Sequence, residues 1–251
     1  MGPRQSSEAI ILRTRAYGES DQIVTFLTAD AGKLTGMAKG AKNSRRRFGN
    51  CLGFFTRVRV QFRTRPGASM VFMESCDLLR APQALAEPAK FAYGSYLVEL
   101  VDQLTAEAHP VREVYDLLAE GLDELERGTA TAAFLRCFEL RLLHHSGYDP
   151  DLQSCGRCHQ PLRSEEQASF DPTHGSIVCA ACRASRQPVL AVSGHTLAVL
   201  DAMKTVSLHD GRRHRLSPAT ATEAAQLMSH LLALHLPRHL RSPKLIAELS
   251  R

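Results

Sequence analysis

The sequence predicts an α+β multidomain protein, in which an N-terminal OB-fold β-barrel precedes an α-helical domain with an inserted four-cysteine motif. Three observations support this prediction. Short β-rich runs fill residues 1–80, helical periodicity begins after Pro82, and two CxxC pairs lie in a polar stretch at 150–188. We therefore expect a barrel domain at 1–80, a helical domain at 81–251, and within it the cysteine insert at 150–188.

Five β-rich runs separated by turn residues predict the barrel, and they cover residues 10–15, 23–28, 34–40, 57–63 and 70–74. Apolar and basic residues alternate along the fourth run, so its apolar side chains should face the core: Val58, Val60 and Phe62. The opposite face carries three arginines, Arg57, Arg59 and Arg63. An SH3-like barrel or a half-sandwich fits the same pattern, so periodicity leaves these alternatives open.

Apolar residues recur at helical spacing in six later segments, at 89–108, 111–126, 131–145, 193–206, 221–236 and 243–249. Gly128 and Gly147 follow two of these segments as stop signals, and Ser193 is placed to cap another. Amphipathic helices with short connections pack together, so we expect a helical bundle domain. The insert at 150–188 fits neither the strand pattern nor the helix pattern.

Charge is distributed unevenly along the chain, whose formal net charge is +5. Residues 1–80 contain 14 Lys and Arg against 6 Asp and Glu, whereas residues 81–251 contain 17 against 20. A basic module joined to a near-neutral one indicates a polyanion-binding segment in the first third of the chain. A basic surface that only confers solubility would show the same balance, so charge alone leaves both interpretations open.

Four of the seven cysteines form two CxxC pairs with 20 residues between them. Each pair turns two thiolates toward one point, and two pairs complete a tetrahedral sulfur shell that suits Zn²⁺. Four thiolates leave no open position for a reacting water, so we predict one structural zinc ion, held by Cys155, Cys158, Cys179 and Cys182. Disulfides and a redox CxxC are the alternatives; the first needs an exported protein, and the second normally accompanies a βαβ unit. His159 and His174 lie in the same insert and are expected at the surface.

No catalytic motif is present, because the sequence lacks a P-loop, HExxH and GxSxG; we therefore predict that the chain is not an enzyme. Cys51, Cys76 and Cys137 occur in apolar contexts and are expected in the core. No apolar run approaches the roughly 18 residues that span a bilayer, and the first ten residues include no hydrophobic signal region. We expect no membrane partner and a cytoplasmic location.

Basic residues cluster after the third predicted strand, in a loop with Lys39, Lys42, Arg45, Arg46 and Arg47. The arginine face of 57–63 follows shortly after. Lys and Arg side chains neutralise phosphates and release counterions, which gives an affinity for nucleic acid that falls steeply with salt. We predict that both groups contact DNA. Interleaved aromatic residues would either stack on unpaired bases or fill the barrel core: Phe48, Phe54 and Phe55.

Three groups of motifs occur in a recognisable order. The barrel segment contains AIILRTR at 9–15, YGESD at 17–21, GKL at 32–34, KGAK at 39–42, SRRRF at 44–48 and the 52–60 region. SGYDPDL at 146–152 leads directly to Cys155 and Cys158, and HLRSPKL at 239–245 ends the pattern. Each motif is modest alone, but their order and the chain length make the sequence similar to RecO, a family of bacterial DNA repair and recombination mediators.

This resemblance implies an OB-fold, a helical domain with a zinc motif, and a non-enzymatic role. The role includes binding single- and double-stranded DNA, annealing complementary strands, and helping to load RecA onto single strands coated by SSB. RecR and the acidic C-terminal tail of SSB are the implied partners, and the implied location is the nucleoid. The tail of SSB docks on the helical domain in this family, where an apolar pocket with a cationic rim would receive it. Arg136 and Arg141, on the segment with Phe134 and Phe138, are the candidate residues.

Two other functions stay open on the sequence. An OB-fold combined with a zinc ribbon also suits an RNA-binding or transcription-associated factor, which would bind single strands without speeding the annealing of complementary ones. The second alternative is a zinc enzyme, which needs an open coordination position that an all-thiolate shell does not provide.

Overall fold

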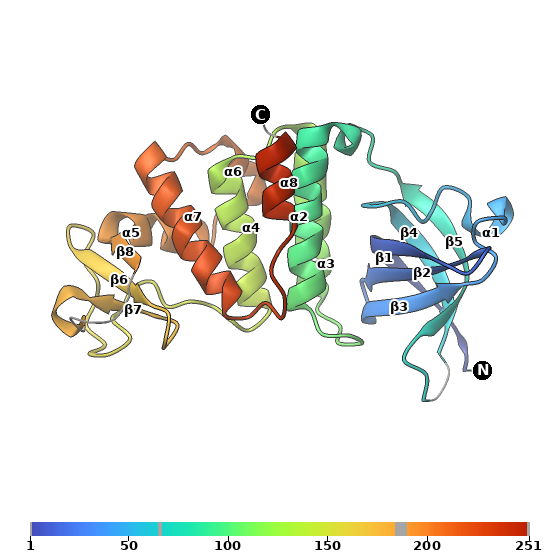
Figure 1. The fold of residues 1–251 in the computed structure, drawn as a ribbon, viewed down its shortest axis with the longest axis horizontal. Helices are drawn as coiled ribbons and strands as arrows, with labels where there is room; N and C mark the ends of the chain where they lie inside the picture. Colours follow the sequence, from blue (N-terminus) through green and yellow to red (C-terminus); the bar gives the residue numbers. More distant parts are fainter. Residues whose placement is uncertain (1, 65–66, 184–189, 250–251) are drawn as a thin grey trace. The chain divides into compact units, whose positions relative to one another are not determined.

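The computed structural model describes residues 2–64, 67–183 and 190–249. The chain divides into two compact units, drawn as a ribbon in Figure 1. Unit 1 comprises Met1–Gly128 together with Leu240–Arg251, and unit 2 comprises Thr129–His239. The last helix of the chain therefore packs with the barrel unit, although more than a hundred residues separate it from the rest of that unit in sequence.

Unit 1 begins with a closed five-stranded barrel, formed by β1 (Arg4–Tyr17), β2 (Asp21–Thr28), β3 (Gly32–Ala38), β4 (Arg57–Arg63) and β5 (Val71–Arg80). The strand order around the barrel is β1-β2-β3-β5-β4. β3 pairs with β5 in parallel, and β1 closes the barrel through antiparallel pairing with β4. This Greek-key closure is that of an OB-fold, which confirms the predicted barrel and removes the SH3-like and half-sandwich alternatives.

The barrel core follows from the alternation along β4. Val58, Val60 and Phe62 are at most 1% exposed, as the period of two predicts. Phe62 meets Phe26 of β2 edge to face, with ring centroids 6.2 Å apart. The same core includes Phe48, the last residue of the one-turn helix α1 (Arg45–Phe48). The predicted loop after β3 therefore contains a helical turn that is anchored by an aromatic side chain.

Three helices complete unit 1: α2 (Pro88–Leu104), α3 (Arg112–Arg127) and α8 (Ser242–Leu249), with a 3₁₀ turn at Ala84–Ala86 before them. α2 ends at Leu104, four residues before the predicted limit at residue 108. The Ala108 N–H donates to the Lys33 carbonyl of β3 at 2.8 Å, so this residue is hydrogen-bonded to the barrel rather than to the helix. α8 lies against α2, where the Glu99 carboxylate accepts hydrogen bonds from the Arg241 and Ser242 N–H groups.

The helices next to the barrel are strongly acidic. Residues 81–128 hold three Lys and Arg against ten Asp and Glu. Asp123 of α3 pairs with Arg57 at 2.7 Å and with Arg80 at 2.6 Å, while Asp102 of α2 pairs with Lys33 at 3.3 Å. Part of the positive charge of the barrel is therefore neutralised within unit 1 rather than left for a ligand.

Unit 2 is built from α4 (Ala132–His145), α5 (Gly194–Met203), α6 (Leu208–Arg213) and α7 (Pro218–Ala233). Ser193 caps α5 as predicted, because its hydroxyl accepts from the Thr196 N–H. Helix α6 was not predicted, since it is only six residues long and contains a glycine. That glycine, Gly211, lies so close to α4 that a Cβ would stand 2.8 Å from Cys137 Sγ.

The insert contains a small sheet that periodicity does not reveal. Its strands are β6 (Gln167–Asp171), β7 (Ser176–Cys179) and β8 (Leu190–Ser193), in the order β7-β6-β8. Strands of four or five residues are too short to show an alternation, which explains the missed prediction. No helix within the described ranges is long and apolar enough to cross a membrane.

Candidate nucleic-acid interface and metal centre

The predicted basic loop forms one surface, which we call the α1 cluster: Lys39, Lys42, Arg45, Arg46 and Arg47. Burial of Phe48, which is 4% exposed, fixes the orientation of helix α1 and turns its arginines outward. Four members of the cluster are exposed and Arg47 is half-buried. Five cations are thus held together at one end of the barrel.

Contacts to the β1–β2 turn hold the α1 cluster in place. The Asp21 carboxylate accepts from the Gly40 N–H at 2.8 Å, and Gly40 has a φ of +65° that suits glycine. Lys42 donates through Nζ to the Glu19 carbonyl at 3.0 Å, and Arg47 donates through Nη2 to the Lys39 carbonyl at 2.8 Å. The partners of Lys42 and Arg47 are neutral carbonyl oxygens, so these two contacts position the cations without cancelling their charge.

The two predicted groups of DNA contacts differ in their charge partners. Across the described ranges, no carboxylate forms an ion pair with a member of the α1 cluster. On β4, by contrast, Arg57 pairs with Asp123, Arg59 with Glu8 at 3.0 Å, and Arg63 with Glu74. Arg57 also donates to the Ala119 carbonyl of α3, so it faces the helices of its own unit. The α1 cluster and the β4 arginines, which the sequence predicts together as DNA contacts, therefore differ in whether their charges are neutralised within the protein.

The three phenylalanines also separate. Phe48 and Phe55 are buried, at 4% and 5% exposure, as the core interpretation predicts. Phe55 packs against Gly94 of α2, where a Cβ would stand 3.2 Å from its ring. Phe54 is 49% exposed, although its ring contacts Phe91 edge to face with centroids 6.4 Å apart. Phe54 is thus the one exposed member of this trio.

The two candidate partner residues lie on α4. Arg136 is 7% exposed, and its guanidinium pairs with the fully buried Glu139 one turn along. Arg141 is half-buried. Phe134 and Phe138 are both fully buried in the core of unit 2, so they do not form an open apolar pocket beside these arginines.

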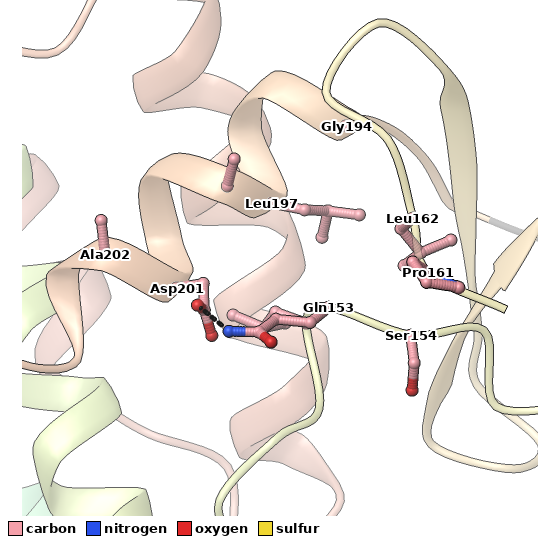
Figure 2. Close-up of a pocket in the computed structure, with 10 residues that line it drawn as sticks. Gln153, Ser154, Pro161, Leu162, Gly194, Leu197, Asp201 and Ala202 are labelled. Carbon is pink, nitrogen blue, oxygen red and sulfur yellow. Dashed lines mark hydrogen bonds between the residues drawn. The ribbon is translucent and has the colours of Figure 1, made fainter. Parts of the chain in front are cut away.

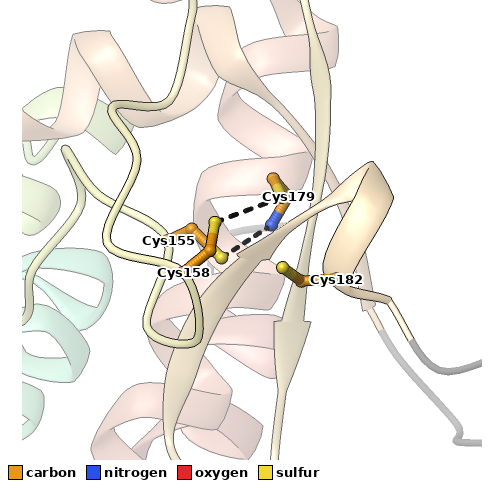
Figure 3. Close-up of side chains that lie close together, drawn as sticks. All are labelled: Cys155, Cys158, Cys179 and Cys182. Atoms are coloured by element: carbon orange, nitrogen blue, oxygen red, sulfur yellow. Dashed lines mark hydrogen bonds between the residues drawn. The ribbon is translucent and has the colours of Figure 1, made fainter.

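The four predicted zinc ligands come together in the insert, and their sulfur atoms all lie within 4.8 Å of one another (Figure 3). The Cys158 and Cys179 sulfurs are 3.9 Å apart. A tetrahedral zinc ion with Zn–S bonds of about 2.3 Å places its ligand sulfurs about 3.8 Å apart. The donor type, the number of ligands and the spacing therefore all fit a closed metal site.

The first CxxC forms the knuckle that such a site requires. His159 adopts a φ of +58°, and its N–H donates to the Cys155 carbonyl at 2.8 Å, which folds the loop back. Burial raises the pKa of the Cys155 thiol, but N–H groups of Cys158, Cys179 and Arg157 outweigh it and lower the pKa to about 6. Hydrogen bonds to Cys158 and Cys179 raise the pKa of the Cys182 thiol to about 12. A bound metal ion would favour the thiolate form of all four cysteines.

Sequence reasoning missed the contacts that brace the metal site. Arg157, between the first two cysteines, donates to the Asp171 carboxylate at 2.9 Å and to the Cys182 carbonyl at 3.0 Å. Asp171 is 1% exposed, and hydrogen bonds from His174 and Arg157 lower its pKa to about 2. Arg157 thus links the two halves of the site. An arginine inside a CxxC, followed by an aspartate in the same insert, was the available signal.

A hollow of about 490 Å³ lies beside the insert, between its loops and α5 (Figure 2). Its lining is largely apolar, and Leu197 and Leu162 are among the side chains that line it. Asp201 is the one ionisable side chain among the described lining residues, and Gln153 Nε2 donates to it at 2.5 Å. This hollow therefore has no constellation of groups suited to acid–base or nucleophilic chemistry.

Known proteins match this chain over nearly its whole length. The family model Recombination protein O N terminal matches residues 1–82, and Recombination protein O C terminal matches residues 85–244. A DNA repair protein RecO of Anaeromyxobacter dehalogenans is 34% identical, over 98% of this chain and 97% of the relative. The DNA repair protein RecO of Myxococcus xanthus is 35% identical, over 98% of each.

A third relative, the DNA repair protein RecO of Syntrophus aciditrophicus, is 33% identical over 98% of this chain and 96% of its own. The two family models meet where the barrel ends and the helices begin, so the order of parts agrees as well. These matches confirm the resemblance, and the non-enzymatic recombination mediators of this family agree with the prediction that the chain is not an enzyme. The chain belongs to the RecO family of DNA repair and recombination proteins.

Proposed function

We propose that this chain is a recombination mediator that binds single- and double-stranded DNA and anneals complementary strands. One observation carries the proposal: five cations of the α1 cluster lie on an OB-fold end and form no ion pair with carboxylates of the described chain. Annealing requires two strands to approach while their mutual phosphate repulsion is screened. A basic surface provides that screening without a nucleotide cofactor.

Within this proposal the α1 cluster supplies the main phosphate contacts. Arg59 and Arg63 on β4 would add weaker contacts, because a phosphate must compete there with Glu8 and Glu74. Arg57 stays a predicted contact from the sequence, but its pairing with Asp123 favours a role within unit 1. Phe54 is the candidate for stacking on an unpaired base, because the residue is 49% exposed.

A structural zinc ion completes the proposal. Cys155, Cys158, Cys179 and Cys182 would hold it, and its chemistry is to cross-link the two knuckles of the insert. Cys179 is the last residue of β7, and Cys182 is the last residue of the 3₁₀ turn at Ala180–Cys182. The ion would therefore join these two elements to the loop that contains Cys155 and Cys158. With four sulfur ligands the ion would take no part in DNA chemistry.

The protein partners are proposed from family membership. We propose that the chain works with RecR and helps to load RecA onto SSB-coated single strands, with the acidic tail of SSB binding to unit 2. Arg141 is half-buried, whereas Arg136 is buried against Glu139, so Arg141 is the better placed of the two candidates. Titration of an SSB tail peptide against the full chain and Arg141→Ala tests this, and equal binding by both proteins would remove Arg141 from the site.

Strand annealing tests the central proposal. The full chain should speed the annealing of complementary oligonucleotides, and Arg45→Ala/Arg46→Ala/Arg47→Ala should lose most of that acceleration. A matched control removes three exposed arginines that are paired with carboxylates elsewhere, at Arg4, Arg112 and Arg163. The control should anneal like the unmodified chain. A chain that binds single strands but never speeds annealing would instead support the RNA-binding or transcription-associated alternative.

A further inference from the structure

A second basic surface lies in unit 2, in a hollow of about 600 Å³ beside the start of α4. We call it the α6 groove, and its consecutive basic residues are Arg212, Arg213, His214 and Arg215. The remaining lining is small or neutral: Thr129, Thr131, Ala132, Ala133 and Leu216. The described residues that line this groove include no carboxylate. Its chemistry is therefore that of an anion-binding surface.

Close packing between α6 and α4 makes the groove a fixed feature of the fold. Gly211 lets the two helices approach, since a Cβ there would stand 2.8 Å from Cys137 Sγ. The Thr131 hydroxyl, which caps α4, also donates to the Gly211 carbonyl at 3.2 Å. At the end of α6 the His214 N–H donates to the Asp210 carbonyl at 2.9 Å. The backbone that carries the arginines is therefore held in place against α4.

Two of the basic side chains that line the α6 groove form no ion pair within the described residues. Arg213 and Arg215 are exposed, and neither forms an ion pair with any carboxylate of the described chain. The first turn of α4, which forms the facing wall, contains no acidic residue. Two guanidinium groups in a concave, acid-free surface concentrate positive potential there and attract polyanions.

The lining of the groove favours a phosphate backbone over an acidic peptide with an aromatic anchor. Its described apolar members are Ala132, Ala133 and Leu216, and it includes no Phe, Tyr or Met against which an aromatic anchor would pack. The planar guanidinium group of arginine can donate two parallel hydrogen bonds to the oxygens of a phosphate, whose charge is opposite. A backbone that presents a phosphate at each nucleotide would use both exposed arginines without needing an apolar pocket.

We propose that the α6 groove binds the phosphate backbone of a second DNA strand, so that one chain carries one strand at the α1 cluster and another on unit 2. This inference rests on the proposed function, because the first strand is the one assigned to the barrel. It adds a mechanism for annealing: each strand is screened by a separate set of arginines, and both are held on one molecule.

The number of strands bound per chain tests the inference. The full chain, titrated with a short oligo(dT) and analysed by native mass spectrometry, should bind two strands. Arg213→Ala/Arg215→Ala should bind one with unchanged affinity and lose most annealing acceleration. Arg45→Ala/Arg46→Ala/Arg47→Ala should also retain one strand, at the α6 groove. The control Arg163→Ala/Lys244→Ala removes two exposed cations outside both surfaces and should still bind two.

The outcomes separate this inference from the proposed function. If the full chain binds a single strand, and only the α1 triple variant loses it, the barrel proposal stands and the groove proposal fails. If the chain binds no DNA, both fail. If Arg213→Ala/Arg215→Ala still binds two strands but no longer binds an acidic peptide ending in Phe, the groove is a protein-docking site and the inference is wrong.

Discussion

Arg57 of β4 and Asp123 of α3 form an ion pair in which Arg57 Nη2 lies 2.7 Å from Asp123 Oδ1. Both side chains are about one-fifth exposed, at 21% and 20%, so solvent screens the pair only in part. The contact joins the barrel to a helix of the same unit. Arg57 therefore has a structural role, although its position on β4 also predicts a contact with DNA.

We expect Arg57→Ala to reduce stability more than DNA affinity. The change removes the Asp123 pair and the hydrogen bond to the Ala119 carbonyl, and we expect a loss of about 1–3 kcal/mol in the free energy of unfolding. Arg80 still pairs with Asp123, which limits the loss. Urea unfolding and oligo(dT) binding, measured on the same samples, check the prediction. A large loss of oligo(dT) affinity with unchanged stability would instead show that Arg57 contacts DNA.

The salt dependence of DNA binding should come mainly from the α1 cluster. Each phosphate contact on a single strand contributes about 0.7 to the slope of log affinity against log salt, so three lost contacts should lower the slope by about 2. Arg45→Ala/Arg46→Ala/Arg47→Ala should show that change. Arg59→Ala should change the slope less, because Glu8 already neutralises its charge. An equal effect of Arg59→Ala would mean that Glu8 leaves the pair when DNA binds.

Loss of a zinc ligand should unfold the insert and lower the melting temperature of the chain. Cys179→Ser removes one sulfur from the cluster and should release the metal, because a closed site needs all four ligands. His159→Asn is the matched control in the same knuckle: asparagine tolerates the positive φ and no ligand is lost. Metal content and thermal melting give the readout, and the spectrum of Co²⁺-loaded protein reports the ligand type. A spectrum that small anions perturb would contradict the closed site.

Asp171 should contribute stability that depends on pH. Its pKa in the folded chain is lowered to about 2 from an ordinary 3.8, so its contribution is complete above pH 3.8 and is lost as the pH falls through 2. Asp171→Asn should therefore be less stable than the unmodified chain near neutral pH, and this difference should shrink toward pH 2. Urea unfolding of both proteins across this range isolates the effect, because acid release of metal is common to both. A difference independent of pH would assign the effect to packing instead.

Local patterns allowed much of this fold to be predicted. Alternation at 57–63 placed Val58, Val60 and Phe62 inside the barrel, because strand side chains alternate regardless of the partner strand. The spacing of Cys155, Cys158, Cys179 and Cys182 likewise predicted a cluster, since each CxxC folds its own knuckle. The same reasoning failed for β6, β7 and α6, which are too short to show a period.

The sequence by itself determined the order of barrel, helices and cysteine insert, and it located the basic residues. Only the tertiary structure decided which charges stay available, since Arg57 meets Asp123 and Arg59 meets Glu8 across 66 and 51 positions. It likewise buried Phe55 but left its neighbour Phe54 open, and it gathered Arg213 and Arg215 beside the start of α4. Periodicity is a property of neighbours along the chain, whereas charge neutralisation and burial depend on residues that only folding brings together.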